Sequence, residues 1–199
     1  MASCALTPIR ADGVQTRADG VTVNIDQDGT AKSLECDKVL VAIGVQPNME
    51  GLGLEELSIA TEKSGITVDD VFSTNIPGVY AIGDVTGKMP LAHVASAQAV
   101  ATAEHIAGME TQPLDYAYMP RATYCQPQIA SFGLTEAQAR EQGHEVKVGT
   151  FNVMANGKAL AMGETDGLVK LVVDARYWEL LGGHMIGTEV TELLGELSM

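Results

Sequence analysis

The sequence lacks the features that mark several classes of protein. In 199 residues there are three cysteines, Cys4, Cys36 and Cys125, and their wide spacing excludes the closely spaced pair of a redox disulfide or metal site. No apolar run approaches the roughly 20 residues that cross a bilayer. The amino terminus has neither a basic start nor an apolar core, so no signal peptide is expected. These absences predict a globular chain in the reducing cytoplasm, with cysteines that pack.

Basic residues are also scarce. The 12 lysines and arginines are outnumbered by 26 acidic residues, which leaves a formal charge of −14. Such a chain repels phosphate backbones and anionic lipids, so neither nucleic acid nor a membrane is expected as a partner. The histidines lack metal-ligand spacing, and no metal site is predicted. No Gly-x-Gly-x-x-Gly is present, and Gly83 to Lys88 is one residue short of a P-loop.

The most informative segment runs from Thr74 to Asp84 and is predicted to be a buried apolar strand that stops at Gly83 and Asp84. A carboxylate at the carboxyl end of such a strand can accept hydrogen bonds from sugar-type hydroxyls. The alternative is an aspartate that caps a turn or helix. An Ala-rich helix over residues 94–106 follows and stops before Gly108. Its amino terminus would offer free N–H groups and partial positive charge.

Elsewhere the pattern predicts short strands and a few helix signals. A strand over residues 21–25, a turn over 26–30 and a strand over 33–43 form a hairpin that ends in a buried run over 39–44. Another strand is expected over 65–69. Thr135 with Gln138 forms a capping box, and Gly143 stops that short helix. Strands then follow over 144–153, 165–173 and 180–187, and Thr188 is expected to cap a helix over 189–194.

Residues 74–84 resemble the second flavin-binding signature of the pyridine-nucleotide–disulfide oxidoreductases. The resemblance implies that Asp84 holds the ribityl chain of FAD and that Pro90, Leu91, Ala92 and His93 lie against the flavin, with the backbone of His93 favoured over its imidazole. A histidine that merely hydrogen-bonds a carbonyl is the alternative for that side chain. Residues 37–48 resemble the end of the NAD-binding domain, where Gly44 would approach the nicotinamide nucleotide; a tight turn at Gly44 is the alternative.

The segment over residues 119–136 is similar to the opening of the dimerisation domain of the same family. The implied fold is therefore α/β remnants of NAD- and FAD-binding domains, residues 1–48 and 49–115, followed by an α+β dimerisation domain, residues 116–199, truncated at its carboxyl end. A homodimer is expected, with apolar surface from Gly182, His184, Ile186, Leu193 and Leu194; for His184, packing within the sheet is the other interpretation.

The strings at Leu91–His93, Asn156–Ala159 and Thr165–Lys170 are similar to the dihydrolipoamide dehydrogenase branch of the family. That branch oxidises dihydrolipoyl groups of 2-oxo acid dehydrogenase complexes with NAD, through FAD and a redox disulfide. The redox cysteines and the catalytic histidine are expected outside these 199 residues. No catalytic residue is therefore assigned, and the chain alone is predicted to be inactive. Two alternatives stay open: a disulfide oxidoreductase similar to glutathione or mercuric reductase, and a non-catalytic dimerisation module.

Overall fold

A computed structural model describes residues 9–198 of the chain, and Cys4 lies outside the described residues. The chain divides into two compact units, residues 1–45 and 46–199. No helix among the described residues is both long enough and apolar enough to cross a bilayer.

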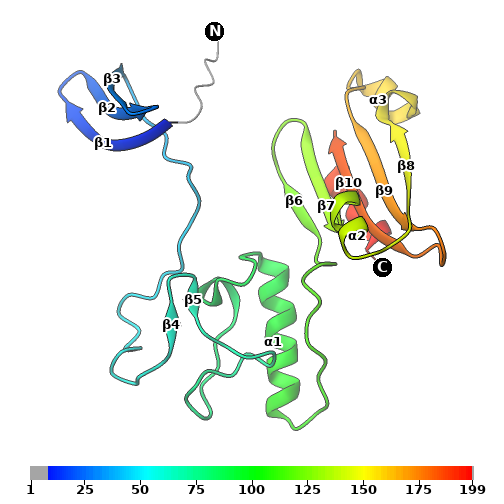
Figure 1. Ribbon diagram of the computed structural model, residues 1–199, viewed down its shortest axis with the longest axis horizontal. Coiled ribbons are helices and arrows are strands. Elements are labelled where there is room, and N and C mark those ends of the chain that lie inside the picture. The colour runs from blue at the N-terminus through cyan, green and yellow to red at the C-terminus, as the bar shows by residue number, and fades with distance from the viewer. Residues whose placement is uncertain (1–8, 199) are drawn as a thin grey trace. The chain divides into compact units, whose positions relative to one another are not determined.

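The first unit is a three-stranded antiparallel meander of β1 (Ile9–Arg17), β2 (Gly20–Gln27) and β3 (Thr30–Cys36) (Figure 1). The predicted strand and turn are confirmed, and the Asp26 carboxylate accepts a hydrogen bond from Gly29 N–H at 2.7 Å within the turn. β1 was not predicted from the sequence. Its pairing register shifts between Ala11 and Gly13, which interrupts the alternation that marks a strand.

The prediction of a strand that continues to Ile43 is wrong. β3 ends at Cys36, and the run over residues 39–44 belongs to no strand. Instead of being buried, Leu40 is 89% exposed and Ile43 is 93% exposed. A run of this composition suits a strand covered on both faces, but no described strand pairs with it. Its hydrophobicity alone therefore does not produce a strand.

Residues 46–115 contain little regular structure before one long helix. β4 (Thr61–Glu62) pairs with β5 (Gly65–Ile66), so the strand predicted over 65–69 is reduced to two residues. The strand predicted over 74–84 does not form. Val79 N–H donates to the Ile76 carbonyl in a turn, and Tyr80 makes a single bridge to Ser73. Ile76 and Val79 still pack against a buried cluster that contains Ala81, so the apolar segment is covered without strand pairing.

The 3₁₀ turn η1 (Gly83–Thr86) and helix α1 (Ala92–Ile106) follow. α1 confirms the predicted helix and begins two residues earlier. Its buried face contains Val94, Gln98, Ala101 and Thr102, which recur at the spacing of one helix face. This face therefore carries two polar side chains into the core.

Residues 121–187 contain a five-stranded antiparallel sheet in the order β6-β7-β10-β9-β8. Its strands are β6 (Arg121–Thr123), β7 (Gln128–Gly133), β8 (Val146–Asn152), β9 (Leu168–Asp174) and β10 (Leu180–Gly187). The strands predicted over 144–153, 165–173 and 180–187 are confirmed within a few residues.

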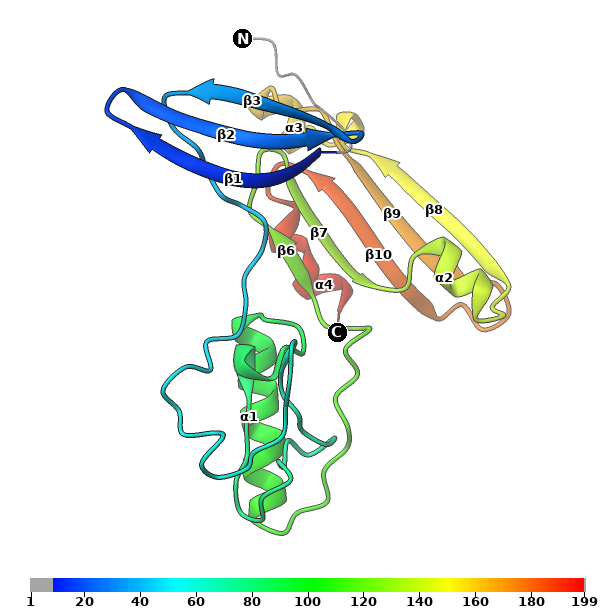
Figure 2. The same cartoon turned by 60° about the vertical axis from the view of Figure 1, so that its left-hand side comes forward.

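Helix α2 (Glu136–Glu141) packs on one face of this sheet, through a cluster of Ala139, Val172 and Leu181. η3 (Val190–Leu193) and α4 (Leu194–Leu197) cover the other face, where Phe132 and Met185 are buried (Figure 2). η2 (Val153–Ala155) and α3 (Gly157–Met162) connect β8 to β9. The predicted capping box is confirmed at the start of α2, and Gly143 follows that helix at φ +90°.

Two predictions about the carboxyl end are wrong. Thr188 does not cap a helix, because its hydroxyl donates to the Glu164 carboxylate and Glu189 precedes η3 instead. Leu194 and Gly182 are buried inside the unit and do not supply outer apolar surface. Ile186 at 41% and Leu193 at 45% remain exposed. His184 is packed, with Nε2 3.0 Å from the Leu134 carbonyl oxygen.

Candidate functional site

Asp84 lies in η1 and is exposed to solvent. Its backbone carbonyl accepts a hydrogen bond from Gly87 N–H at 3.0 Å, which closes the turn. Its carboxylate accepts no hydrogen bond from the part of the chain that the structure describes. The turn therefore presents an acceptor for hydroxyl groups of a ligand.

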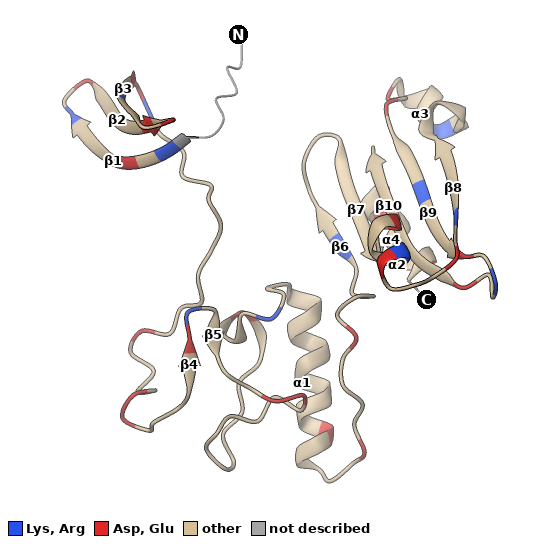
Figure 3. Cartoon of the chain, viewed as in Figure 1, with Lys and Arg blue, Asp and Glu red and all other residues tan. Residues whose placement is uncertain are grey.

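The amino terminus of α1 offers the complementary groups. Leu91, at the N-cap, makes no side-chain capping hydrogen bond, so the N–H groups of the first turn lack a side-chain acceptor. Pro90, Ala92 and His93 are exposed, whereas Leu91 is half-buried. No lysine, arginine, aspartate or glutamate occurs on α1 before Glu104 (Figure 3). The partial positive charge of the terminus is therefore not neutralised by an acidic side chain of the helix.

The imidazole of His93 is occupied by the protein itself. Its Nε2 lies 2.8 Å from the Pro120 carbonyl oxygen, a distance at which the ring N–H donates. This contact matches the alternative that the sequence left open for the side chain. The backbone of His93 remains the group that can face a ligand.

The Asp84 turn and α1 are held together by a glutamine that the sequence analysis missed. Gln98 is completely buried, and its Oε1 accepts a hydrogen bond from Gly83 N–H at 2.6 Å. Gly83 has φ +75°, and a Cβ there would lie 3.4 Å from the Cβ of Ala95, in the first turns of α1. A glutamine in an Ala-rich helix gives little local signal. Only its place on the buried face, four residues after Val94, could have drawn attention to it.

This group of residues fits a flavin nucleotide in its donors and acceptors. The Asp84 carboxylate can accept from hydroxyls of a ribityl chain, and uncapped helix amides can donate to an electron-rich ring edge. The surroundings of Gly44 do not show a comparable fit for NAD. No atom lies within 4 Å of a Cβ placed on Gly44, and the segment is exposed.

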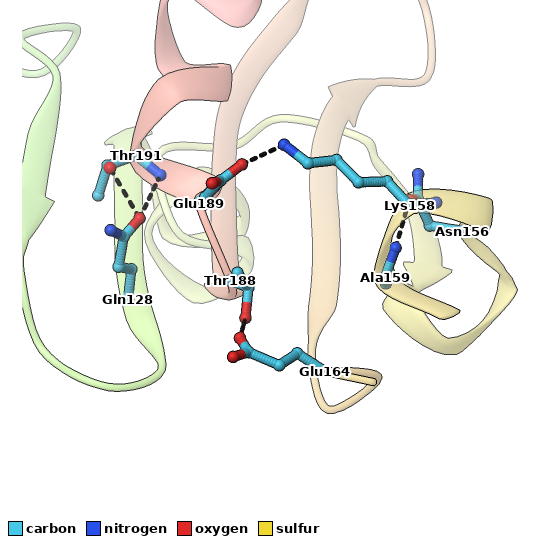
Figure 4. A network of polar contacts seen from close by, with 8 residues as sticks. All are labelled: Gln128, Asn156, Lys158, Ala159, Glu164, Thr188, Glu189 and Thr191. Atoms are coloured by element: carbon cyan, nitrogen blue, oxygen red, sulfur yellow. Dashed lines mark hydrogen bonds and ion pairs between the residues drawn. The ribbon is translucent and has the colours of Figure 1, made fainter. Parts of the chain in front are cut away.

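An apolar cavity lies elsewhere, in the sheet region. It has a volume of about 340 Å³ and is lined by Phe151, Val169 and Leu193 together with the Lys158–Glu189 ion pair. Figure 4 shows the polar contacts beside it, including the one between Thr188 and Glu164. The cavity lining includes neither the exposed start of a long helix nor a turn with a free carboxylate. The cavity therefore does not match a flavin site.

Three of the described groups have shifted pKa values: Tyr118 before β6, Glu136 in α2 and Asp174 at the end of β9. Burial, followed by the charges of Glu179 and Asp115, raises the pKa of Tyr118. A hydrogen bond from Lys170, followed by one from Arg140, lowers the pKa of Glu136. The shifts come from burial, neighbouring charges and hydrogen bonds, and none of the three groups is a candidate site residue.

The remaining candidate groups are possible metal ligands and the cysteines. Among residues 9–198 no cluster of three or more histidine, cysteine or acidic side chains could hold a metal ion. Cys36 is half-buried, as a packing role requires, and its thiol lies 3.6 Å from the Val21 carbonyl oxygen. The prediction of a packing role is wrong for Cys125, which is exposed. It lies in the β6–β7 connection, where its thiol donates to the Pro127 carbonyl oxygen at 3.0 Å.

Two family profiles match this chain. Residues 5–99 match the profile described as pyridine nucleotide-disulphide oxidoreductase, and residues 119–199 match the dimerisation domain of the same family. The chain belongs to the pyridine nucleotide-disulphide oxidoreductase family. Membership implies the use of a flavin and a pyridine nucleotide, and it confirms the predicted combination of nucleotide-binding and dimerisation parts.

Curated relatives in this family are named dihydrolipoyl dehydrogenase. The protein from Mycobacterium leprae is 53% identical over 98% of this chain, and that from Bacillus subtilis is 43% identical over 94%. The chain spans about two fifths of the length of these relatives, 42% and 40%.

Solved structures of family members have the same fold. LpdA from Mycobacterium tuberculosis superposes with a TM-score of 0.86 at 27% identity, covering 96% of this chain and 41% of that one. The HOCl-induced flavoprotein disulfide reductase RclA from Escherichia coli superposes with a TM-score of 0.83 at 26% identity, covering 96% and 43%.

Proposed function

We propose that this chain provides the later part of the flavin site and the dimerisation unit of a dihydrolipoyl dehydrogenase. The enzyme would oxidise dihydrolipoyl groups of 2-oxo acid dehydrogenase complexes with NAD, through FAD and a redox disulfide. Identities of 43 to 53% to dihydrolipoyl dehydrogenases over nearly the whole chain favour this activity over that of glutathione or mercuric reductase. Two cysteines of the disulfide would have to come from outside these residues, because Cys4, Cys36 and Cys125 are far apart.

Within this proposal residues 1–48 end the NAD-binding domain, 49–115 belong to the FAD-binding domain, and 116–199 form the dimerisation domain. The single observation that supports the flavin assignment is the Asp84 turn, which lies against the uncapped start of α1. Pro90, Leu91, Ala92 and the backbone of His93 would line the same side of the flavin. The proposal that NAD binds, with Gly44 as a contact, rests on family membership alone. The free thiols Cys36 and Cys125 suit a reducing compartment such as the cytoplasm.

Titration with FAD, followed by flavin fluorescence, tests the site. The purified chain should be colourless and should bind FAD weakly, since the described residues offer no glycine-rich pyrophosphate cradle. Asp84→Ala should weaken binding about tenfold or more, because a hydrogen bond to a charged group contributes about 1.5–3 kcal/mol. Glu110→Gln removes an exposed acidic group just beyond the other end of α1 and is the matched control. No binding by the wild-type chain at about 1 mM FAD, or equal weakening by both substitutions, would contradict the assignment.

The absence of turnover is a second expected outcome. Without a dithiol acceptor among its own cysteines, the chain should produce no NADH from dihydrolipoamide and NAD. If a preparation free of contaminating enzyme forms NADH above a blank without protein, the proposal that the redox disulfide lies outside these residues is wrong.

Assembly can be tested separately from the flavin. We propose a homodimer through residues 116–199, which match the dimerisation profile from residue 119. Sedimentation over a concentration series should show a reversible monomer–dimer equilibrium. Leu193→Glu should shift it toward monomer, since Leu193 is 45% exposed. Leu57→Glu is the control, because Leu57 is 56% exposed outside the proposed dimerisation domain. A strictly monomeric wild-type chain at high concentration would refute this interface.

A further inference from the structure

The amide group of Gln98 makes a hydrogen bond at each of its two ends, although its side chain is completely buried. Gly83 N–H can only donate, so the oxygen of the amide faces it, at 2.6 Å. The nitrogen then donates to the Tyr116 hydroxyl at 3.0 Å. Gln98 therefore connects the turn that carries Asp84 to the segment that leads into β6.

The later residues of the Asp84 turn lie close to the backbone of Ser64 and Gly65. A Cβ on Gly65 would lie 2.4 Å from the Val85 carbonyl oxygen, and a Cβ on Gly87 would lie 1.9 Å from that of Ser64. Such spacings leave no room between β5 and the turn. These backbone contacts involve the later residues of the turn, Val85 and Gly87, whereas its start at Gly83, next to Asp84, is held by Gln98.

Tyr116 is itself part of a fixed segment. The next residue, Ala117, accepts a hydrogen bond at its carbonyl from Gly133 N–H, at the end of β7, at 2.8 Å. Three residues further, the Pro120 carbonyl meets His93 on α1. A displacement of this segment would therefore reach Gln98 directly through the Tyr116 hydroxyl.

We propose that Gln98 is a positioning residue that sets the Asp84 turn according to the position of the 116–120 segment. The consequence for flavin rests on the function proposed above: Gln98 orients the carboxylate that accepts from the ribityl hydroxyls, without touching the cofactor. The position of residues 116–120, just before β6, would thereby determine where Asp84 lies on one side of the flavin site.

Amide hydrogen exchange of the whole chain, read residue by residue by NMR, tests this link without any flavin. Gln98→Met keeps the length of the side chain and removes both hydrogen bonds, so exchange of Gly83 N–H should rise at least tenfold. Tyr116→Phe should raise it by a smaller factor, several-fold, because the Gln98 amide loses only its anchor. Thr102→Val is the matched control: it removes a buried hydrogen bond from the same helix, the one to the Gln98 carbonyl, and should leave Gly83 unchanged.

A merely structural role predicts a different pattern. If Gln98→Met accelerates exchange equally throughout α1 and the turn, the side chain supplies general stability and the proposal is overturned. If Tyr116→Phe folds with an intact core and the exchange rate of Gly83 N–H is unchanged, the proposal is overturned as well. In FAD titrations the double variant Gln98→Met/Asp84→Ala should lose no more affinity for FAD than Asp84→Ala alone. If the exchange pattern is as expected but the wild-type chain does not bind FAD, the flavin assignment is rejected and the link between Tyr116, Gln98 and the Asp84 turn is kept. Normal FAD binding with unchanged exchange would reject the link alone.

Discussion

Replacing Gly133 with alanine should disrupt the sheet at the junction of β7 and β10. Gly133 has φ +68°, and a Cβ there would lie 2.2 Å from the Leu181 carbonyl oxygen and 2.7 Å from the Cα of Gly182. The left-handed conformation costs an alanine about 1–2 kcal/mol, and insertion against rigid backbone costs about 1–3 kcal/mol. The expected loss is therefore about 2–5 kcal/mol, a large part of the roughly 5–15 kcal/mol that stabilises a domain.

Gly149 in β8 is the matched control for this substitution. It has no atom within 4 Å of an added Cβ and does not have a positive φ, so Gly149→Ala should be neutral or stabilising by about 0.5–1 kcal/mol. Urea denaturation can be followed by the fluorescence of Trp178, the single tryptophan, which lies between β9 and β10. At a slope of about 2 kcal/mol per molar urea, the Gly133→Ala midpoint should fall by about 1–2.5 M. Equal midpoints for the two variants would refute the steric argument.

Three further outcomes are expected. A hydrogen bond from His144, followed by one from the backbone, lowers the pKa of Asp174, so its stabilising effect is present above the ordinary value near 3.9 and is lost as the pH falls below it. The deficit of Asp174→Asn in urea midpoint should therefore be largest near pH 7 and shrink toward pH 3; a constant deficit would contradict this. Thr135→Ala should lower stability by about 1 kcal/mol through loss of the capping box, and an unchanged midpoint would show that the box contributes nothing. Cys125 should react with a thiol reagent faster than Cys36, which peptide mapping by mass spectrometry can compare; the reverse order would contradict their exposures.

Local signals in the sequence predicted those elements that depend on neighbouring residues. The β2–β3 hairpin has its turn residues in place, and α1 has a long run without glycine or proline. The capping box at Thr135 needs only Gln138, three residues away. In each case the partners lie within one turn or one hairpin, so the pattern contains the information that determines the structure.

Elements that depend on distant partners could not be predicted in this way. Residues 74–84 are apolar and partly covered, but burial in a cluster of turns does not require strand pairing. At the candidate site, the positions of Asp84 and His93 followed from a motif. Gln98 did not, because its two partners are 15 and 18 residues away and meet it only in the folded chain.

The exposed apolar run after β3 affects how the protein behaves in concentrated solution. Between Lys38 and Glu50 the chain has no charged residue, and Val39, Val41 and Ile43 are β-branched residues with high β-propensity. Uncharged segments of this kind pair readily with copies of themselves into cross-β stacks, and charges on their flanks are the usual protection. Protection here is present on one side only, at Asp37 and Lys38. Self-association through this run would break no strand pairing, because the run belongs to no strand, and Val41→Lys should suppress it.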